Sequence, residues 1–289
     1  MDNISIEKIR NTSEFEAIFD AAYLDRVAVE KMMALSNRKQ RTWHLPGYCE
    51  VCGKAVRFLI DWVNSFETPE GKMPSYRERI ICEDCGLNNR QRFMAAFLRK
   101  AMNKLDGNDH RVYLYEQVTQ FFKLMQAAKT KAEIFGSEYL GHDKKPGELI
   151  KNIRHEDALS LSMASDSIDI IVSNDVYEHV PDISTALAEA CRVLKKGGRL
   201  LFSVPFHASQ DTTTQRARLD QGVVTHLLPE RYHGNPVSFK GSLVFYDFGW
   251  DLLDFCRAAG FSDVYMLCYY SMMYGYIGEG MQYMFVAEK

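Results

Sequence analysis

The chain contains 289 residues, of which 46% are hydrophobic and 12% aromatic, and it carries a formal net charge of −3. That length and apolar content suffice to bury a full core, as one ordinary domain with an accessory module. The weak negative charge argues against a nucleic-acid binder, which would usually be more basic, and no run approaches the roughly 20 apolar residues of a membrane span.

The first 40 residues predict a helical segment. They open with MDNISIEKIR, which is polar and acidic where a signal peptide would be basic and then apolar, so we expect a cytoplasmic protein. From residue 14 to residue 37, apolar side chains recur at helical spacing and predict one helix.

Residues 41–105 predict a zinc-ribbon module followed by a basic helix. Two extended segments, KAVRFLIDWV and YRERIIC, are flanked by the sequences YCEVCG and ICEDCG. The four cysteines of these CxxCG repeats are Cys49, Cys52, Cys82 and Cys85. Four thiolates can close a tetrahedral zinc site, which would be structural because every coordination position is filled. An odd total of seven cysteines also favours metal binding in a reducing compartment over disulfides, and the alternative is four unrelated core residues.

A basic helix is expected within GLNNRQRFMAAFLRKAMNKL, residues 86–105. Its cations include Arg90, Arg92, Arg99 and Lys100, and the stretch contains no acidic residue. The simpler interpretation is the solvated face of an amphipathic helix, and the alternative is a patch that binds RNA or another anion. The following LDGND, residues 105–109, predicts a domain boundary.

Residues 106–289 predict an α/β domain in which strands and helices alternate. The expected strands are residues 112–115, 132–135, 151–155, 168–173, 199–204, 263–270 and 282–287. The expected helices are residues 117–128, 183–194 and 249–259, and Asp182 is the predicted N-cap of the second. Strands separated by helices predict βαβ units, and hence a mostly parallel sheet of seven strands with helices on both faces.

One block of this domain carries a family resemblance. The sequence DSIDIIVSNDVYEHVPD, followed by LAEACRVLKKGGRLLFSVP, resembles the later half of class I S-adenosylmethionine-dependent methyltransferases. The similarity runs from about Val112 to the C-terminus and implies a Rossmann-like fold and S-adenosyl-L-methionine as cofactor. Within that superfamily, the chain looks most like a bacterial branch associated with glycan and surface-polysaccharide biosynthesis, which often has an N-terminal CxxCG pair.

The resemblance implies cofactor contacts just after the strands, because ligands of open α/β sheets lie beyond the carboxyl ends. Glu138 follows the second strand, where a carboxylate accepts hydrogen bonds from both ribose hydroxyls. Asp157 matches the position that meets the adenine amino group, and Asn174 and Asp175 lie near the expected sulfonium. For each carboxylate taken alone, a solvated loop residue is the alternative.

The first strand and helix, RVYLYEQVTQFFKL, depart from most of the superfamily because they contain no glycine. A glycine-rich turn normally lets the methionine carboxylate approach backbone amides. Here Glu116 is expected to hold the cofactor's ammonium while Thr119 or Gln117 caps the helix. The alternative for Glu116 is an ordinary acidic residue at a helix start.

Histidines are the candidate catalytic bases, since methyl transfer to a hydroxyl requires proximity and removal of a proton. His207 follows the fifth strand and His233 lies in the insertion of residues 208–246, so these two are the candidates. His179 is expected to orient the start of a helix. The insertion is expected to cap the substrate, and its arginines could grip an anion. The aromatic residues 269–285 could form a sugar-stacking wall or, more simply, pair as core-facing strands.

We therefore predict transfer of a methyl group from S-adenosylmethionine to an oxygen of a saccharide or nucleotide-sugar, with zinc as a structural metal. The expected partner is a small-molecule or saccharide acceptor. The first alternative is methylation of RNA or protein, with the ribbon and the basic helix as the binding arm. The second is a non-catalytic zinc-ribbon scaffold whose methyltransferase-like domain has degenerated.

Overall fold

The computed structural model describes residues 4–69, 71–105, 107 and 109–289. The chain divides into two compact units, Met1–Lys104 with Met266–Met284, and Leu105–Tyr265 with Phe285–Lys289. The sequence did not indicate that residues near the C-terminus would join the first unit. The predicted boundary at residues 105–109 contains residues 106 and 108, which lie outside the described residues.

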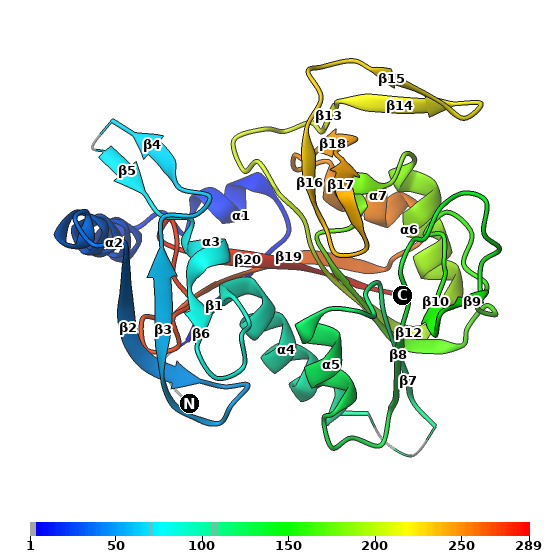
Figure 1. The fold of residues 1–289 in the computed structure, drawn as a ribbon, viewed down its shortest axis with the longest axis horizontal. Helices are drawn as coiled ribbons and strands as arrows, with labels where there is room; N and C mark the ends of the chain where they lie inside the picture. Colours follow the sequence, from blue (N-terminus) through cyan, green and yellow to red (C-terminus); the bar gives the residue numbers. More distant parts are fainter. Residues whose placement is uncertain (1–3, 70, 106, 108) are drawn as a thin grey trace. The chain divides into compact units, whose positions relative to one another are not determined.

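The first unit contains a short sheet of β2, β3 and β6, together with four helices. Its elements along the chain are β1 (Ser5–Ile9), α1 (Thr12–Glu16), α2 (Ala21–Asn37), β2 (Thr42–Cys49), β3 (Lys54–Asp61), β4 (Phe66–Thr68), β5 (Gly71–Met73), α3 (Tyr76–Arg79), β6 (Ile81–Cys82) and α4 (Asn89–Met102). Strands β2 and β3 form an antiparallel hairpin, and β6 pairs with β3 (Figure 1).

Two predictions for this unit were wrong in detail. The single helix over residues 14–37 is two helices, because Asn11 caps α1 and Asp20 caps a second start at α2, each through a 2.9 Å bond to a backbone amide. The segment YRERIIC is extended only at β6. Its first four residues form a helical turn, and from there Arg79 reaches Asp61 of β3 at 2.8 Å.

The core of the first unit joins α4 to the returning segment near residue 275. Phe93 of α4 stacks on Tyr269 with ring centroids 3.5 Å apart, and Tyr276 is fully buried beside both rings. These aromatic residues therefore lie in the core, and the sugar-wall interpretation does not apply to them. Arg92 is also fully buried, with its guanidinium donating to the carbonyls of Tyr274 and Gly275.

The central sheet has seven strands in the order β1-β19-β20-β12-β11-β7-β8. The strands not yet given are β7 (Arg111–Leu114), β8 (Glu133–Gly136), β11 (Ile168–Asn174), β12 (Leu194–Ser203), β19 (Asp263–Tyr270) and β20 (Gln282–Glu288). Strands β8, β7, β11 and β12 pair in parallel, whereas β20 runs antiparallel to β12 and β1 antiparallel to β19. The predicted seven-stranded α/β sheet with parallel strands is confirmed.

The seventh strand is not the expected one. Residues 151–155 were predicted as the third strand, but Lys151 and Asn152 adopt left-handed φ values of 52° and 66° and form a turn. Only β10 (Ile153–Arg154) is extended there, and it pairs antiparallel with β9 (Leu149–Ile150). His155 keeps one parallel bridge to Glu138. The remaining place in the sheet is taken by β1, which the sequence analysis assigned to no strand.

The helices of the second unit begin at side-chain caps. Helix α6 (Ile183–Val193) starts after Asp182, whose carboxylate accepts from the amide of Thr185 at 3.1 Å, so the predicted N-cap is confirmed. Helix α5 (Gln120–Gln126) starts three residues later than expected, because Thr119 caps it. Helix α5 contacts β8 and α6 contacts β12. Helices on both faces of the sheet remain a prediction.

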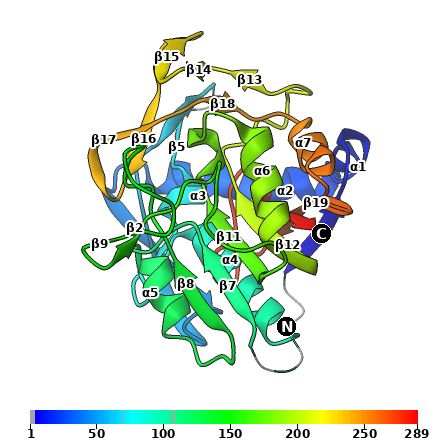
Figure 2. The ribbon, with the colours of Figure 1, turned by 90° about the vertical axis from the view of Figure 1, so that its right-hand side faces the viewer.

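The insertion of residues 208–246 forms two hairpins and precedes α7 (Leu252–Ala258) in the chain. The strands of this region are β13 (Thr214–Gln215), β14 (Ala217–Asp220), β15 (Val223–His226), β16 (Tyr232–Asn235), β17 (Ser238–Leu243) and β18 (Tyr246–Asp247). Strand β13 pairs with β18. Strand β14 pairs with β15, and β16 with β17. Both views show the β14–β15 hairpin extending away from α6 (Figures 1 and 2).

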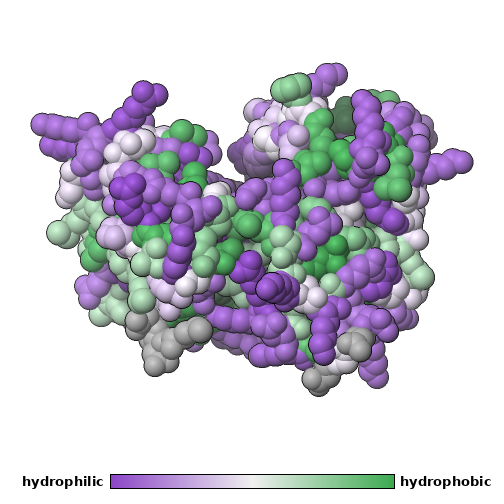
Figure 3. Space-filling model, turned by 60° about the horizontal axis from the view of Figure 1, so that its bottom comes forward, coloured by the Kyte–Doolittle hydropathy of each residue, from purple (hydrophilic) through white to green (hydrophobic). Residues whose placement is uncertain are grey.

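The surface is largely polar on the face shown in Figure 3, with smaller apolar patches between the polar side chains. Among the described residues, no helix is both long enough and apolar enough to cross a membrane.

Candidate active site and metal centre

The carboxyl edge of the parallel strands is the natural place for a ligand. Strand β7 lies between β8 and β11, so the chain first adds β8 on one side of β7 and later adds β11 on the other. Ligands of open α/β sheets bind where the strand order reverses in this way. The predicted Glu116, Glu138 and Asp175 lie just beyond the ends of β7, β8 and β11, and the predicted Asn174 is the last residue of β11.

Glu116 and Asn174 are in direct contact at this edge. Glu116 is 7% exposed, and its Oε1 accepts a 2.6 Å hydrogen bond from Nδ2 of Asn174. Its Oε2 accepts from the hydroxyl of Thr119. The amide oxygen of Asn174 is buried and has no hydrogen-bond partner within the described part of the chain. An acceptor left without a donor fits a ligand that brings its own N–H groups, such as an ammonium.

Glu138 holds the turn between β7 and α5. Its Oε1 accepts hydrogen bonds from the backbone amides of Gln117 at 2.7 Å and Val118 at 2.9 Å. Burial raises the pKa of this carboxyl, and the two amide bonds act in the opposite direction. A glycine-rich turn would offer such amides to the cofactor, whereas this turn gives two of them to a neighbouring side chain. Ribose binding by Glu138 would therefore depend on its second oxygen, Oε2.

A glycine does serve this turn, but on the adjacent strand. A Cβ atom added to Gly136 of β8 would lie 2.1 Å from the carbonyl oxygen of Glu116 and 2.8 Å from the ring of Phe122. The β7–α5 turn therefore passes directly over bare backbone at Gly136. Gly136 thus lets the turn itself pack closely on β8, which a residue with a Cβ atom would prevent.

The other two predicted carboxylates are engaged in local contacts. Asp157 is half-buried, and its Oδ1 accepts from the amide of Leu159 at 2.9 Å, which stabilises a turn. Asp175 adopts a left-handed φ of 52° and accepts a 2.7 Å hydrogen bond from the hydroxyl of Ser203. A left-handed aspartate directly after a central strand costs conformational energy, a feature that concentrates at functional sites.

Of two further residues that organise the edge, sequence reasoning expected Gln117 only as a possible helix cap and missed Glu156. Gln117 accepts from the amide of Arg154 at 2.8 Å and donates to the carbonyl of Asn152 at 3.0 Å, so it ties the first turn to the third strand region. Glu156 is 3% exposed and binds Arg154 at 2.7 Å and the amide of Ser162 at 2.8 Å. Each is adjacent in sequence to a predicted site residue, Glu116 or Asp157. Their roles follow only from the hydrogen bonds seen in the folded chain.

The two candidate bases lie in different side-chain clusters. His207 has a side chain 41% exposed, and its Nε2 is 3.9 Å from Asp247, whose carboxylate also binds Arg216 and Arg231 at 2.7 Å each. These two arginines are thus paired with a carboxylate of the protein. His233 of β16 instead lies 3.6 Å from the carboxylate of Glu178.

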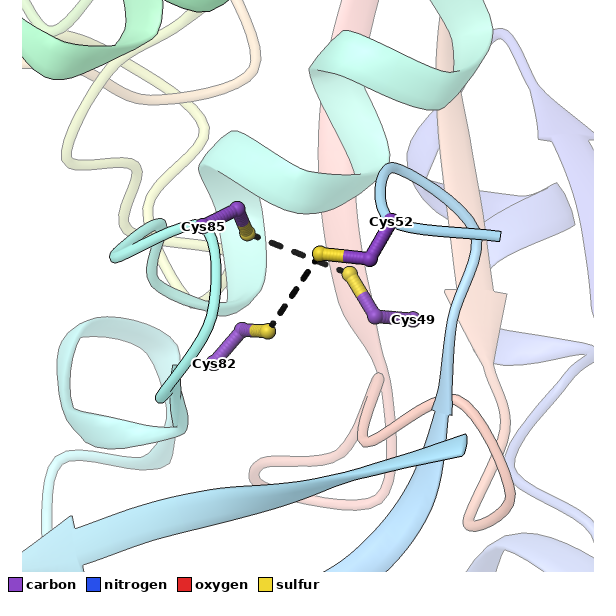
Figure 4. Close-up of side chains that lie close together, drawn as sticks. All are labelled: Cys49, Cys52, Cys82 and Cys85. Atoms are coloured by element: carbon purple, nitrogen blue, oxygen red, sulfur yellow. Dashed lines mark hydrogen bonds between the residues drawn. The ribbon is translucent and has the colours of Figure 1, made fainter. Parts of the chain in front are cut away.

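The four cysteines of the CxxCG repeats come together, as Figure 4 shows. The sulfur atoms of Cys49 and Cys85 are 3.9 Å apart, and those of Cys52 and Cys82 are 3.8 Å apart. A tetrahedral zinc site with Zn–S bonds of about 2.3 Å requires sulfur separations of about 3.8 Å. The glycines after the second cysteine of each pair adopt φ values of 69° and 72°, as the tight turns require.

Comparisons with known proteins identify a methyltransferase domain. Residues 102–202 match the family model described as "Methyltransferase domain". A 65-residue stretch is 45% identical to the arsenite methyltransferase of Aquipseudomonas alcaligenes, covering 22% of this chain and 19% of that protein. A 47-residue stretch is 45% identical to the malonyl-[acyl-carrier protein] O-methyltransferase of Methylococcus capsulatus, covering 16% of this chain and 17% of that protein.

The chain thus spans less than a fifth of the length of these two curated relatives. A solved structure, an S-adenosylmethionine-dependent methyltransferase from Mesorhizobium loti, is 15% identical with a TM-score of 0.39, covering 68% of this chain and 98% of that one. The family match supports the predicted methyltransferase domain over the matched residues, which include β7, β8, β11 and α6.

Proposed function

We propose that this protein transfers a methyl group from S-adenosylmethionine to an acceptor molecule. The observation that carries the proposal is the match of residues 102–202 to a methyltransferase domain, because that stretch supplies the strands whose carboxyl ends present Glu116, Glu138 and Asn174. The cofactor bears an ammonium, a sulfonium and a ribose diol, and a pocket rich in carboxylates and amide oxygens suits all three.

The proposed roles of the cofactor residues follow from the acceptor atoms that they bring to this edge of the sheet. Glu116 and the unpartnered oxygen of Asn174 would receive the ammonium of the methionine end. The second oxygen of Glu138 would receive a ribose hydroxyl, Asp157 the adenine amino group, and Asp175 would face the sulfonium region. Binding energy would come from charge-assisted hydrogen bonds in a partly buried setting.

The proposed acceptor is an oxygen of a saccharide or nucleotide-sugar, as the resemblance to a glycan-associated branch suggests. The proposed domains are residues 1–40, 41–105 and 106–289, with the hairpins of residues 208–246 capping the acceptor. His207 or His233 would remove the acceptor proton. Methylation of RNA through the basic helix gains little support, because Arg92 is fully buried and Arg90 binds Glu78 at 2.8 Å.

The residues Cys49, Cys52, Cys82 and Cys85 fit a structural zinc ion in number, chemistry and spacing. Bound zinc would cross-link the turn after β2 to the turn after β6 and stabilise the first unit. Because four thiolates fill a tetrahedral coordination shell, the ion would have no open position for a substrate.

The test is a calorimetric titration of the full chain with S-adenosylhomocysteine. We expect wild-type protein to bind, and Glu116→Ala and Glu138→Ala each to weaken binding at least tenfold, since each removes a charged acceptor (about 1.4 kcal/mol or more). The matched control is Glu133→Ala, an exposed glutamate on β8, which should bind like wild type. Absence of binding by wild-type protein would support the scaffold alternative, and undiminished binding by Glu116→Ala would refute the role given to Glu116.

A further inference from the structure

Glu178 is a buried carboxylate that accepts no hydrogen bond from the part of the chain that the structure describes. It lies in the helical turn η1 (Tyr177–His179), which begins three residues after β11 ends. The residue is 0% exposed, and neither carboxylate oxygen receives a hydrogen bond from the described residues. An ionised carboxylate removed from water costs several kcal/mol unless a cation or donors compensate it.

The imidazole of His179 faces this carboxylate with an acceptor nitrogen. Its Nδ1 lies 2.8 Å from the backbone carbonyl of Leu243, and a carbonyl only accepts, so Nδ1 carries a proton. In the neutral ring, Nε2 then presents a lone pair, and this atom is 3.6 Å from Oε1 of Glu178. A histidine whose other ring N–H is donated to a backbone carbonyl is the usual arrangement of a metal ligand.

His233 completes the cluster from a distant part of the sequence. Its Nδ1 lies 3.6 Å from the same Oε1, and its ring is perpendicular to that of His179 with centroids 5.2 Å apart. Ligand atoms of all three residues lie within 4.8 Å of one another. Metal–ligand bonds of about 2.0–2.2 Å place neighbouring donor atoms about 3.0–3.5 Å apart. The two separations of 3.6 Å from the Glu178 carboxylate are already close to this range.

We propose that Glu178, His179 and His233 bind a divalent transition-metal ion. Two imidazoles and one carboxylate favour a first-row ion such as Zn²⁺, Mn²⁺ or Fe²⁺ over Ca²⁺ or Mg²⁺, which prefer oxygen ligands. Three protein ligands leave coordination positions open, unlike the four cysteines. The site is therefore of the type that binds a substrate as well as a metal.

The role of the ion rests on the proposed methyltransferase function. An acceptor hydroxyl bound to the ion would lose its proton more readily, to water or to a nearby base. The oxygen would then form a bond to the methyl carbon as the carbon–sulfur bond breaks, and the bonding electron pair would stay on sulfur. In this scheme His233 is a metal ligand and His207 alone remains a candidate base.

The competing account is an ion-pair cluster in which one histidine is an imidazolium. An imidazolium N–H would be expected to approach the carboxylate to about 2.7–2.9 Å, whereas both separations are 3.6 Å. The two accounts differ in whether a metal ion binds, which can be measured directly.

The experiment measures Mn²⁺ binding by the full chain after loading with one equivalent of Zn²⁺, which the softer thiolate site takes first. Free Mn²⁺ is followed by its electron paramagnetic resonance signal. We expect wild-type protein to bind about one Mn²⁺, and His233→Ala and Glu178→Gln each to weaken binding at least tenfold. The matched control is His226→Ala, a histidine of the same insertion that faces Glu230, and it should bind like wild type.

Circular dichroism establishes that each variant is folded. His233 is about one-third exposed on a hairpin, so its substitution tests the site even if the buried Glu178→Gln variant does not fold. Failure of wild-type protein to bind Mn²⁺, or equal binding by His233→Ala, would overturn the proposal. Mn²⁺ binding without S-adenosylhomocysteine binding would uphold the ion site and refute the methyltransferase function, and the reverse result would refute only the ion site.

Discussion

Gly136 lies on β8, directly beneath the β7–α5 turn. We expect Gly136→Ala to lower the free energy of unfolding by about 1–3 kcal/mol, because the new methyl group would overlap the carbonyl of Glu116 and the ring of Phe122. The turn would also be displaced, so affinity for S-adenosylhomocysteine should fall. Denaturant titration and calorimetry measure the two effects.

The matched control for this substitution is Gly234→Ala. A Cβ atom at Gly234 would meet nothing within 4 Å, so stability should change by less than about 0.5 kcal/mol. Equal stability of both variants would show that the turn does not depend on Gly136.

At the scale of single residues, the sequence predicted positions better than partners. Glu116, Glu138 and Asn174 were selected because they follow strands, and the structure places them at one edge. The sequence did not predict that one oxygen of Glu138 accepts hydrogen bonds from two backbone amides. Those partners depend on the shape of the β7–α5 turn, which packs closely on Gly136. Glu178 was overlooked because burial and the approach of His233 are properties of the folded chain.

At the scale of elements, Arg92 fixes helix α4 to the segment that returns from β19. Replacing it in Arg92→Met keeps most of the side-chain volume but removes the donors to the carbonyls of Tyr274 and Gly275. It also removes a cation 4.0 Å from the ring of Phe58. We expect a loss of about 2–4 kcal/mol in the free energy of unfolding, measured by denaturant titration.

The matched control on the same helix is Lys100→Ala. Its side chain is 53% exposed and pairs with Glu50, so the loss should stay below about 1 kcal/mol. A small effect of Arg92→Met would mean that the helix is held by its apolar face alone.

Element prediction succeeded where the apolar pattern was strong. The buried strand β11 and the capped helix α6 were located closely, because a continuous apolar run and a clear N-cap specify them. Strand β12 was found from its buried residues 200–203, but it begins at Leu194, five residues before the predicted start. The strand expected at residues 151–155 failed because two consecutive left-handed residues break it, and neither is a glycine. Strand β1 escaped notice because Ile9 is its only buried residue, so its pairing depends on β19.

At the scale of the whole molecule, the chain folds as two compact units, and the first is completed by residues 266–284. Pattern reasoning assigned that stretch to the second domain because it follows the methyltransferase motifs in sequence. The stretch belongs to the first unit because of contacts between segments more than 180 residues apart, such as those of Arg92. Local periodicity in the sequence carries no information about such contacts.

Glu30 makes another contact of this kind and should give the stability of the protein a dependence on pH. It is 1% exposed in α2, and its carboxylate accepts from the amides of Gly278 at 2.9 Å and Gly280 at 3.2 Å. Burial raises the pKa of this carboxyl from 4.5 to about 7, although the amide bonds act in the opposite direction. The folded protein therefore retains a proton that the unfolded chain has lost between about pH 4.5 and pH 7.

Because the folded state binds more protons in that window, the Glu30 contribution to the free energy of unfolding should fall as pH rises, by up to about 3 kcal/mol. In Glu30→Gln the amide oxygen can still accept from one of the two glycine amides, and the side chain does not ionise. We expect this variant to be more stable than wild type at pH 8. Its free energy of unfolding should also lack the decrease that Glu30 causes between pH 5 and about pH 7.5. The control is Glu67→Gln at an exposed position of β4, which should keep the wild-type profile. Parallel profiles for wild type and Glu30→Gln, measured by urea titration across this range, would show that Glu30 is ionised in the folded protein at neutral pH.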